Sequence, residues 1–459
     1  MIDTGTLDVL RKQFSGEIVD QDHADYDAAR RVWNGMIDRR PAAVARASSV
    51  EDVVAAVTFA RERDVLLSVR CGAHSGPGFS TCDGGLVLDL RAMKEVRVDP
   101  DRRTATVAGG ALLGDLDRAS QAHGLATTAG VVSHTGVAGL TLGGGFGRLQ
   151  RKHGLTIDNL LSVEVVTAAG EILRASEDEN TELFWGLRGA GHNFGVATSF
   201  EFRLHPVGPN VLAGMAVYPI EQSDDIVGAY RQWSASLGDD IISGISFMTM
   251  PPSMPFPSEI AGRKVVQVIA MHVDGDPDRS AELEPVTKFA SPLFEMIVPL
   301  PYVMLQAMAD DAFAWGQRNY VKGGYLTELG DDVAELAAAA VTNAPGPRAD
   351  VAFLQMGGAI GRVPEDATAF TGRNAAFLAN IENVWTDPNE DARHAAWTRE
   401  TNDALSKHFT AGNYVNIVED PDADSRAIYG GPKYARLRAL KKQYDPTNLF
   451  RLNQNIVPA

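Results

Sequence analysis

The sequence predicts an α+β protein that contains more than one domain. Its 459 residues are enough for about three domains at roughly 150 residues each. In the first third of the chain, short apolar runs of strand length alternate with a one-sided helical pattern. From about residue 210 the glycine clusters stop, and alternating strands mix with Ala-rich helices. The residues after about 410 change again, to a basic helix and an Asn-rich tail.

Local patterns justify the elements of the first third. The residues from Ser48 to Glu51 have the spacing of a capping box, so a helix is expected to begin there. Valines and alanines then fall on one helical face, from Val50 to Ala60. Apolar runs predict strands at 65–69, 86–90, 163–167, 171–173 and 200–202, and a hairpin at 96–98 and 104–106.

The later elements follow from the same patterns. The alternation from Val265 to Val273 predicts a strand, and the Ala-rich run from Asp332 to Val341 predicts a helix. A basic helix is expected from Tyr434 to Tyr444, because a proline at the second following position stops it. These shifts in character divide the chain into 1–208, 209–409 and 410–459.

Charge and composition exclude several classes of protein. Lys and Arg total 42 against 59 Asp and Glu, a net charge of −17, so no basic surplus exists to neutralise nucleic acid or an acidic membrane. The chain has no apolar run of about 18 residues, and its acidic start is unlike a secretory signal. Two cysteines, Cys71 and Cys82, cannot build a disulfide framework. We expect a soluble, cytoplasmic protein without nucleic-acid or membrane partners.

The strongest local signal is RCGAHS, from Arg70 to Ser75, with Gly76 and Gly78 after it, between two expected strands. Successive backbone N–H groups in such a turn can converge on an anion such as a pyrophosphate. Arg70 would add a charge-assisted hydrogen bond, and His74 would lie beside the bound cofactor. An ordinary turn with a surface histidine is the alternative that spacing alone leaves open.

A second glycine cluster runs from Gly136 to Gly147 (GVAGLTLGGGFG). Its three consecutive glycines would let the backbone approach a flat ligand or a phosphate closely; a tight packing corner is the alternative. The cluster lacks the Lys-Ser/Thr of a Walker loop and the context of a Rossmann fingerprint. The histidines are scattered, and no nucleophile elbow is present, so we expect neither a metal site nor a catalytic serine.

Taken together, four segments in this order resemble the berberine-bridge-enzyme-like flavoproteins of the vanillyl-alcohol-oxidase superfamily. They are RCGAHS (70–75), GVAGLTLGGGFGRLQRKHGLTIDNL (136–160), FWGLRGAGHNFGVAT (184–198) and YDPTNLFRLNQNI (444–456). The resemblance covers nearly the whole chain. It implies a two-subdomain, PCMH-type FAD-binding domain at 1–208 (the PCMH part at about 38–208), a substrate domain with an antiparallel sheet at 209–409, and a C-terminal segment at 410–459 that returns to the FAD domain.

The resemblance implies an FAD cofactor that is bonded covalently to the ring of His74. Many members of the family hold the flavin by a second, thioether bond from a cysteine, but that position is Val132 in this chain. A single link through His74 is therefore implied. The cofactor-binding positions that the resemblance implies are Arg70, Cys71, Gly72, Ala73, His74, Ser75, Gly78, Gly130, Val132, Thr135, Gly136, Gly139, Leu140, Gly143, Gly144, Gly145, Gly195, Val196, Asn416, Asn453 and Asn455.

The stretch GVVSHTGVAGL (130–140) resembles a bacterial subgroup of the family. The subgroup includes relatives of D-6-hydroxynicotine oxidase and the favorskiase-type flavoprotein of enterocin biosynthesis. Thr135 and Leu140 match positions on the side of the flavin that oxygen reaches in the latter. Its catalytic acid aligns near Ala352, which can serve as neither acid nor base, so the same polyketide reaction is not expected.

The resemblance implies an FAD-dependent oxidase that takes a hydride from an organic alcohol, sugar or amine, with O2 as reoxidant giving H2O2. A base must accept the substrate's proton, and the tyrosine often used in the family is Ile417 in this chain. The candidates are Tyr414, Tyr325 with Lys322 as a neighbouring cation, and His134. A flavin N5-oxide oxygenase of secondary metabolism, or a dehydrogenase with poor O2 reactivity, remains open, as does the choice between monomer and homodimer.

Overall fold

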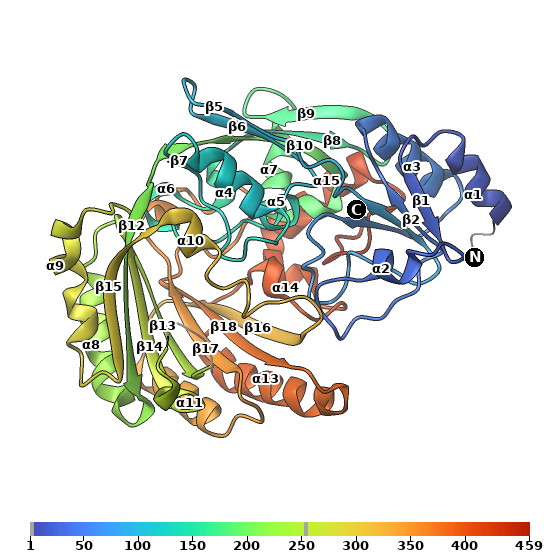
Figure 1. Ribbon diagram of the computed structural model, residues 1–459. Helices are drawn as coiled ribbons and strands as arrows, with labels where there is room; N and C mark the ends of the chain where they lie inside the picture. The colour runs from blue at the N-terminus through green and yellow to red at the C-terminus, as the bar shows by residue number, and fades with distance from the viewer. Residues whose placement is uncertain (1–3, 252–255) are drawn as a thin grey trace.

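Three large β-sheets and one two-stranded ribbon organise the chain in the computed structural model, which describes residues 4–251 and 256–459 (Figure 1). Helices lie beside each of these sheets, so the predicted α+β class is confirmed. Within the described ranges, no helix combines the length and the apolar character needed to cross a bilayer.

The first sheet has four strands in the order β1-β2-β4-β3. The strands are β1 (Glu17–Asp20), β2 (Ala43–Arg46), β3 (Leu67–Arg70) and β4 (Leu86–Asp89). The β1 strand is antiparallel to β2, whereas β2, β4 and β3 run parallel. The helices of this region are α1 (Thr4–Arg11), α2 (Tyr26–Arg30) and α3 (Val50–Glu62).

The predicted α3 helix is present, but its cap differs from the expected one. The N-cap is Ser49, whose side chain accepts a hydrogen bond from the backbone N–H of Asp52. The Asp52 carboxylate in turn accepts a hydrogen bond from the backbone N–H of Ser48. Ser49 and Asp52 therefore take the places expected for Ser48 and Glu51, because the shorter, buried aspartate reaches back to the chain that precedes the helix.

The second sheet has five antiparallel strands in the order β5-β6-β10-β8-β9. They are β5 (Val96–Asp99), β6 (Thr104–Ala108), β8 (Leu160–Val166), β9 (Ile172–Ser176) and β10 (Val196–Arg203), with a ribbon of β7 (Leu125–Ala126) and β11 (His205–Pro206). The predicted β5–β6 hairpin is confirmed. The helices here are α4 (Leu113–Gln121), α5 (Val137–Leu142), α6 (Gln150–His153) and α7 (Thr181–Ala190).

The third sheet has seven antiparallel strands in the order β15-β12-β14-β13-β17-β18-β16. They are β12 (Asn210–Pro219), β13 (Ile241–Thr249), β14 (Lys264–His272), β15 (Phe294–Pro301), β16 (Arg318–Leu326), β17 (Ala349–Gln355) and β18 (Phe377–Trp385). The helices of this region are α8 (Ser223–Ala235), α9 (Ser280–Leu283), α10 (Tyr302–Gln306), α11 (Asp331–Thr342), α12 (Ala359–Arg362) and, after the last strand, α13 (Asp391–Leu405).

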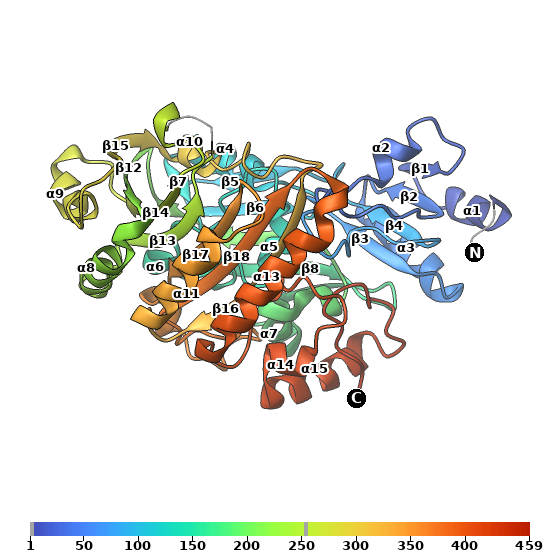
Figure 2. The same ribbon diagram turned by 90° about the horizontal axis from the view of Figure 1, so that it is seen from below.

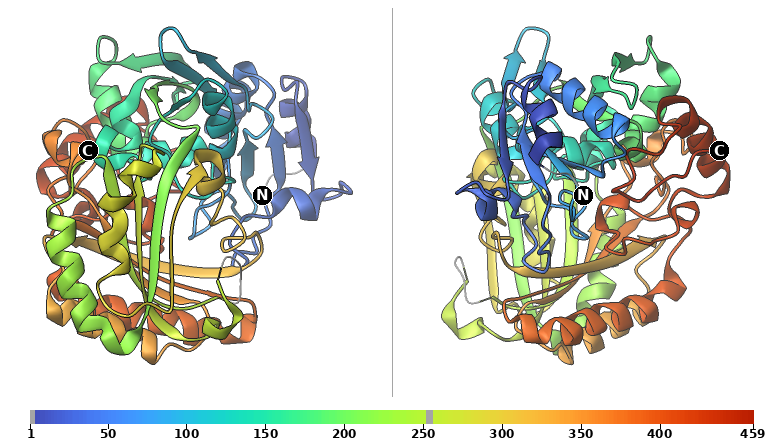
Figure 3. Two further views of the ribbon diagram at one scale, coloured as in Figure 1. Left: turned by 60° about the vertical axis from the view of Figure 1, so that its left-hand side comes forward. Right: turned by 90° about the vertical axis from the view of Figure 1, so that its right-hand side faces the viewer.

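The two faces of the seven-stranded sheet have different environments. The α8, α11 and α13 helices cover one face, where Phe247, Phe353 and Ile381 belong to the apolar core (Figures 2 and 3). The other face is turned toward the first two sheets (Figure 3). Because side chains alternate across a strand, every second residue of β16, β17 and β18 points toward the first two sheets. This second face is called the inner face below.

The C-terminal segment returns to the first two sheets as α14 (Ser425–Tyr429), α15 (Gly431–Tyr444) and a final extended stretch. The α15 helix packs beside α7 (Figure 1). Its Lys441 and Asp445 form a fully buried ion pair of 2.7 Å. The Lys441 ammonium also donates hydrogen bonds to the backbone carbonyls of Asn193 and Phe450, which fixes the tail against the five-stranded sheet region.

A buried ion pair joins the second and third sheets. Asp158, in the 3-10 turn before β8, accepts a hydrogen bond of 2.8 Å from Arg373, in the loop before β18. Their side chains are 8% and 0% exposed. Removing one partner of such a pair leaves an uncompensated buried charge, which makes the pair a fixed point between the two halves.

We predict that Asp158→Asn lowers the free energy of unfolding by about 3 to 5 kcal/mol, because Arg373 then stays buried without its counter-ion. Denaturant titration followed by tryptophan fluorescence measures the change. Glu182→Gln is the control, since it breaks an exposed ion pair with Arg436 and should cost no more than about 1 kcal/mol. Equal effects of the two substitutions would contradict the prediction.

Candidate functional site

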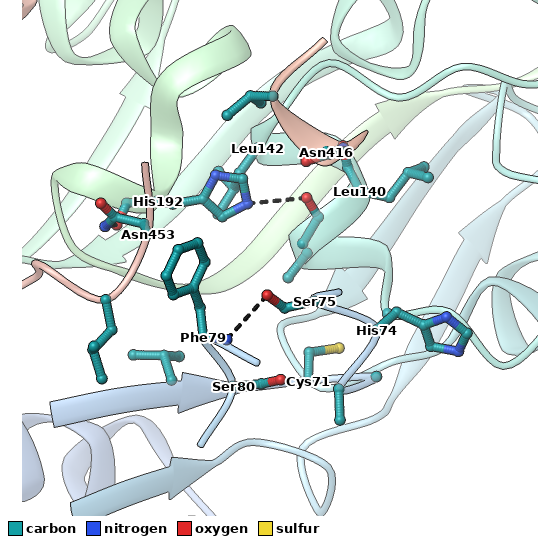
Figure 4. A pocket seen from close by; sticks show the side chains of 18 of the residues that line it. Cys71, His74, Ser75, Phe79, Ser80, Leu140, Leu142, His192, Asn416 and Asn453 are labelled. Atoms are coloured by element: carbon teal, nitrogen blue, oxygen red, sulfur yellow. Dashed lines mark hydrogen bonds between the residues drawn. The ribbon is translucent and has the colours of Figure 1, made fainter. Parts of the chain in front are cut away.

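A cavity of about 400 Å³ lies between the first two sheets and the C-terminal segment, within the usual size range of ligand pockets. Stretches far apart in the sequence line it together, and Figure 4 shows their side chains around one space. The residues expected at a cofactor that line this cavity are Cys71, Gly72, Ala73, His74, Ser75, Thr135, Gly136, Gly139, Leu140, Gly195, Val196, Asn416 and Asn453.

Two glycines let the loop after β3 approach the start of α5. A Cβ atom on Gly72 would lie 2.1 Å from the backbone nitrogen of Gly136, and one on Gly136 would lie 2.5 Å from the backbone nitrogen of Gly72. Real Cβ atoms do not come so close to backbone, so neither position tolerates a side chain. Between them, the two segments form one wall of the cavity.

Protein packing does not explain the glycine at position 139. It lies inside α5 with ordinary helical surroundings, and a Cβ atom there would meet no protein atom within 4 Å. Alanine is favoured over glycine inside a helix by about 1 kcal/mol, so packing of the protein does not explain the residue. Gly139 lines the cavity, and the missing Cβ leaves room for a ligand against the helix backbone.

His74 lies at one end of the group of side chains in Figure 4. Its ring stacks on Trp33 with centroids 4.7 Å apart, and its Nε2 atom lies 2.7 Å from Nδ1 of His134. Burial, with a smaller contribution from His134, lowers the pKa of His74 to about 3. The ring is therefore neutral at neutral pH. When Nε2 carries the proton toward His134, Nδ1 presents a free lone pair.

The opposite end of the cavity is built from the C-terminal tail. Asn453 donates through Nδ2 to the backbone carbonyl of His192 at 2.8 Å, and the His192 ring lies 3.1 Å from the carbonyl of Gly139. Figure 4 shows Asn453 and His192 side by side, across the cavity from His74. The Oδ1 atom of Asn453 is buried without a partner among the described residues, so it can accept a hydrogen bond from a ligand.

Tyr414 is the predicted catalytic residue that lines the cavity. Its hydroxyl oxygen accepts a hydrogen bond of 2.9 Å from Asn416, which also donates to the backbone carbonyl of Leu140. Burial raises the pKa of Tyr414 above its ordinary value. At neutral pH the phenol is therefore protonated, and it can position a ligand by donating a hydrogen bond.

Comparison with known proteins identifies the family. A family model described as FAD binding domain matches residues 41–176, and one described as berberine and berberine like matches residues 413–457. An FAD-linked oxidoreductase of Dictyostelium discoideum is 34% identical over 430 residues, which cover 93% of this chain and 91% of the relative. The chain belongs to the berberine-bridge-enzyme-like FAD-linked oxidoreductases.

Two further relatives match over almost the whole chain. The (R)-6-hydroxynicotine oxidase of Paenarthrobacter nicotinovorans is 29% identical, covering 96% of this chain and 97% of the relative. The crystal structure of 6-hydroxy-D-nicotine oxidase from Arthrobacter nicotinovorans superposes with a TM-score of 0.86 at 27% identity, covering 97% and 98% of the two chains. The chain is thus an FAD-dependent oxidoreductase with the PCMH-type fold, and the cavity with its open helix backbone at Gly139 fits this cofactor.

Arg70, expected from the sequence to contact the pyrophosphate of the cofactor, does not line the cavity of this berberine-bridge-like chain. Its side chain is fully buried and donates hydrogen bonds to the backbone carbonyls of Ala29 and Ser80. The carboxylate of Asp89 lies 3.7 Å away. Arg70 therefore supports the cavity loop from behind, because its guanidinium is already committed to the protein.

Other expected cofactor positions also lie outside the cavity lining. They are Gly78, Gly130, Val132, Gly143, Gly144, Gly145 and Asn455. A Cβ atom on Gly144 would lie 2.6 Å from the Phe370 ring, and one on Gly143 would lie 2.1 Å from Oδ1 of Asn416. Gly143 and Gly144 therefore pack against protein side chains, as the packing-corner alternative predicts, and a position of this run along the flavin stays a prediction.

Lys322 cannot serve as the cation beside Tyr325. Both residues belong to β16, where positions three apart point to opposite faces. Lys322 is opposed to Ile381, in the helix-covered core, and Tyr325 is opposed to Leu378 on the inner face. Tyr325 is fully buried, which raises its pKa well above the ordinary value. The two side chains leave β16 on opposite faces, so Lys322 does not supply the neighbouring charge that would lower the pKa of Tyr325.

The sequence analysis did not identify Trp33 or a set of acids on the third sheet. Burial, with the charge of Glu382 second, raises the pKa of Asp350 to about 8. Burial also raises the pKa of Glu382, and raises that of Glu419 well above its ordinary range. Their one local signal is an acid at an alternate position of an otherwise apolar strand, as in ADVAFLQ and FLANIENVW. No motif links them.

We predict that Gly139→Ala folds normally but carries less flavin, because the added Cβ intrudes where the cofactor lies. Overpacking by one carbon costs about 1 to 3 kcal/mol, enough for a severalfold loss of flavin per polypeptide measured by absorbance. Gly228→Ala in α8 is the control, because its Cβ also meets no protein atom within 4 Å and it lies far from the cavity lining. Full flavin content in Gly139→Ala would argue against this wall of the cavity as part of the FAD-binding site.

Proposed function

We propose that the chain is an oxidase that holds FAD by a single covalent bond to His74, oxidises a small organic alcohol, sugar or amine, and uses O2 as its reoxidant. Bound FAD supplies a two-electron acceptor for a substrate hydride and passes the electrons to O2, giving H2O2. The observation that carries the proposal is the placement of His74 in the cavity wall, with Nε2 held by His134 and Nδ1 without a hydrogen-bond partner in residues 4–251 and 256–459.

The His74 environment favours a covalent bond in a defined orientation. Trp33 stacks on the ring, and the indole N–H of Trp33 is itself tied to the backbone carbonyl of Phe313 at 2.6 Å. With the ring fixed and Nε2 directed at His134, Nδ1 is the atom left to bond to the flavin. We therefore propose His134 as a positioning residue for the attachment, in place of the catalytic base considered from the sequence. Val132 offers no thiol for a second bond.

The residue that accepts the substrate's proton is expected on the inner face of the third sheet. Tyr414 is protonated at neutral pH and is assigned to positioning. Asp350, with a pKa raised to about 8 mainly by burial, can exchange a proton near neutral pH. Glu382 is directly opposed to it on the next strand. We propose this carboxyl pair as the proton acceptor.

One observation favours a second candidate function. Thr135 and Leu140, which the sequence matches to the oxygen side of an oxygenating relative, both line the cavity. A flavin N5-oxide oxygenase is therefore the alternative, and a dehydrogenase with poor O2 reactivity is the variant in which this side excludes oxygen. A bacterial, cytoplasmic enzyme, working as a monomer or homodimer, remains our expectation; both cysteines are free, as is usual in a reducing compartment.

We predict that wild-type protein stays yellow after acid precipitation and gains the mass of FAD, whereas His74→Ala releases all its flavin. Absorbance of the washed pellet and intact-protein mass spectrometry measure the two effects. His134→Ala should lower the attached fraction, because Nε2 of His74 loses its partner. The exposed His123→Ala is the control and should keep the bond. Release of the wild-type flavin by acid would refute the covalent assignment.

We predict that a substrate bleaches the flavin under anaerobic conditions and that air restores the oxidised spectrum with stoichiometric H2O2. A panel of sugars, alcohols, cyclic amines and phenols, followed by stopped-flow absorbance and a peroxide assay, tests this. Bleaching without rapid recovery in air would identify a dehydrogenase. A starting spectrum that is lost on reduction, and returns only with oxygen in a shape unlike ordinary flavin, would identify the N5-oxide oxygenase.

A further inference from the structure

Three carboxyl groups form a row that begins on the third sheet and ends in the C-terminal segment, where one of them reaches the cavity wall. Asp350 on β17 and Glu382 on β18 are directly opposed, and Glu382 is opposed to Val321 on β16. Beyond the β16 edge the row continues to Glu419, whose carboxylate lies against Gly76 in the cavity wall. The charge of Glu382 acts on both Asp350 and Glu419, so the three groups share one electrostatic environment. These residues are called the carboxyl row.

The protein leaves part of the carboxyl row without partners. Glu419 is 8% exposed, and its carboxylate accepts no hydrogen bond from any residue in 4–251 or 256–459. The Oδ1 atom of Asp350 is also buried without a partner in those ranges. Glu382 accepts a hydrogen bond from Nδ2 of Asn319. Ser246 also acts on the Asp350 carboxyl, and Asn380 on that of Glu382. Since buried acceptors are normally satisfied, the unused Oδ1 atom of Asp350 indicates that a ligand with a donor group completes the row.

The nearby cations are engaged elsewhere. The Arg348 guanidinium donates to the side chain of Gln317 and to the backbone carbonyl of Ala312. The Lys322 side chain leaves β16 on the helix-covered face. Of the three acids in the row, only Glu419 has its pKa lowered by the charge of Lys322. Among the described residues, no ion pair within 4.0 Å includes Asp350, Glu382 or Glu419. The charge of Arg348 acts on Glu382 and that of Lys322 acts on Glu419, but neither cation is ion-paired with the row, and neither acts on Asp350.

The absence of a metal-binding cluster in the described ranges, together with the neighbouring aromatic residues, indicates which kind of cation fits the carboxyl row. In the described part of the chain, no three acids, histidines or cysteines are placed to share a metal ion, so an organic cation fits better. On the same inner face, Tyr325 lies about 13 Å further along β16, at 3.3 Å per residue, and packs in an aromatic cluster with Phe370 and Tyr414. Between the two ends stand the short residues Gly323 and Ala352, with the polar Asn380 opposed to both.

We infer that the carboxyl row recognises the protonated nitrogen of an organic amine, whose apolar part faces the aromatic cluster. The inference rests on the proposed function, because it names the substrate class of that same oxidase: amines, and not sugars or neutral alcohols. A sugar presents paired donors and acceptors and no charge, so it would leave the row without a counter-ion. An ammonium group offers both the missing donors and the missing charge.

The test compares a permanent cation with its uncharged carbon isostere. Benzyltrimethylammonium and neopentylbenzene have the same shape, and neither can be oxidised at a protonatable nitrogen. Binding to the flavin-loaded protein is measured by flavin difference absorbance and, independently of the flavin, by calorimetry. We expect the cation to bind at least about tenfold tighter, the ratio that one well-placed opposite charge supplies. The preference should weaken from pH 8 to pH 6, because the pKa of Asp350 is about 8 and its carboxyl gains a proton.

Variants separate the carboxyl row from the overall acidity of the chain. At pH 9, where the Asp350 carboxyl is mostly ionised because its pKa is about 8, Asp350→Asn and Glu382→Gln should each reduce the preference for the cation about tenfold while leaving the isostere's affinity unchanged. Glu295→Gln, on the exposed edge strand β15, removes the same charge at a distance and should keep the preference. Equal binding of cation and isostere by wild-type protein, or equal effects of all three substitutions, overturns the inference.

The outcomes for the inference and for the proposed function are distinct. If the protein is a yellow oxidase that does not prefer the cation, the proposed function stands and the amine assignment is wrong. A protein that never carries flavin loses the proposed function, and calorimetry then still decides whether the row prefers a cation. Flavin content and the midpoint of thermal unfolding are measured for each variant, so a misfolded protein is recognised before its binding is interpreted.

Discussion

The close approach of two backbones at Gly72 and Gly136 is the constraint on which the site depends. Side chains at either position would lie within 2.1 to 2.5 Å of backbone nitrogen, so the contact exists only because both residues are glycine. It brings the loop of the parallel sheet against the first turn of α5, which belongs to the antiparallel sheet region. His74 and Thr135 then fall on one cavity wall, although about sixty residues separate them in the chain.

Some groups that the sequence suggests as cofactor contacts are instead used in contacts that support this wall. Arg70 is a strong cation next to an apparent anion-binding loop, yet its guanidinium holds the loop to the backbone of Ala29 and Ser80. The glycine run after α5 is similarly used against Phe370 and Asn416. A cavity that must stay open needs rigid walls, and these contacts provide the rigidity. What faces the cavity is mainly backbone, apolar surface and a few placed polar atoms.

The strand register of the third sheet decides which of its side chains face the first two sheets and which face the helices. One face of β16, β17 and β18 is apolar and covered by helices, so alternation forces the remaining side chains toward the cofactor region. The inner face can therefore carry acids and aromatic residues without weakening the core. A substitution on the inner face leaves the helix-covered core residues of the sheet in place.

The sequence by itself determined the fold class, the strands β3 to β6, β8 to β10 and β14, the helices α3, α11 and α15, and the segments of the cofactor cavity. These features rest on local rules: apolar periodicity, turn chemistry and glycines within short motifs such as 70–75 and 136–140. Only the tertiary structure decided which way Arg70 points, that Lys322 and Tyr325 lie on opposite faces, and that Asp350, Glu382 and Glu419 share one environment. The physical reason is that side-chain direction and long-range neighbours depend on strand register and packing between distant elements, which no local pattern contains.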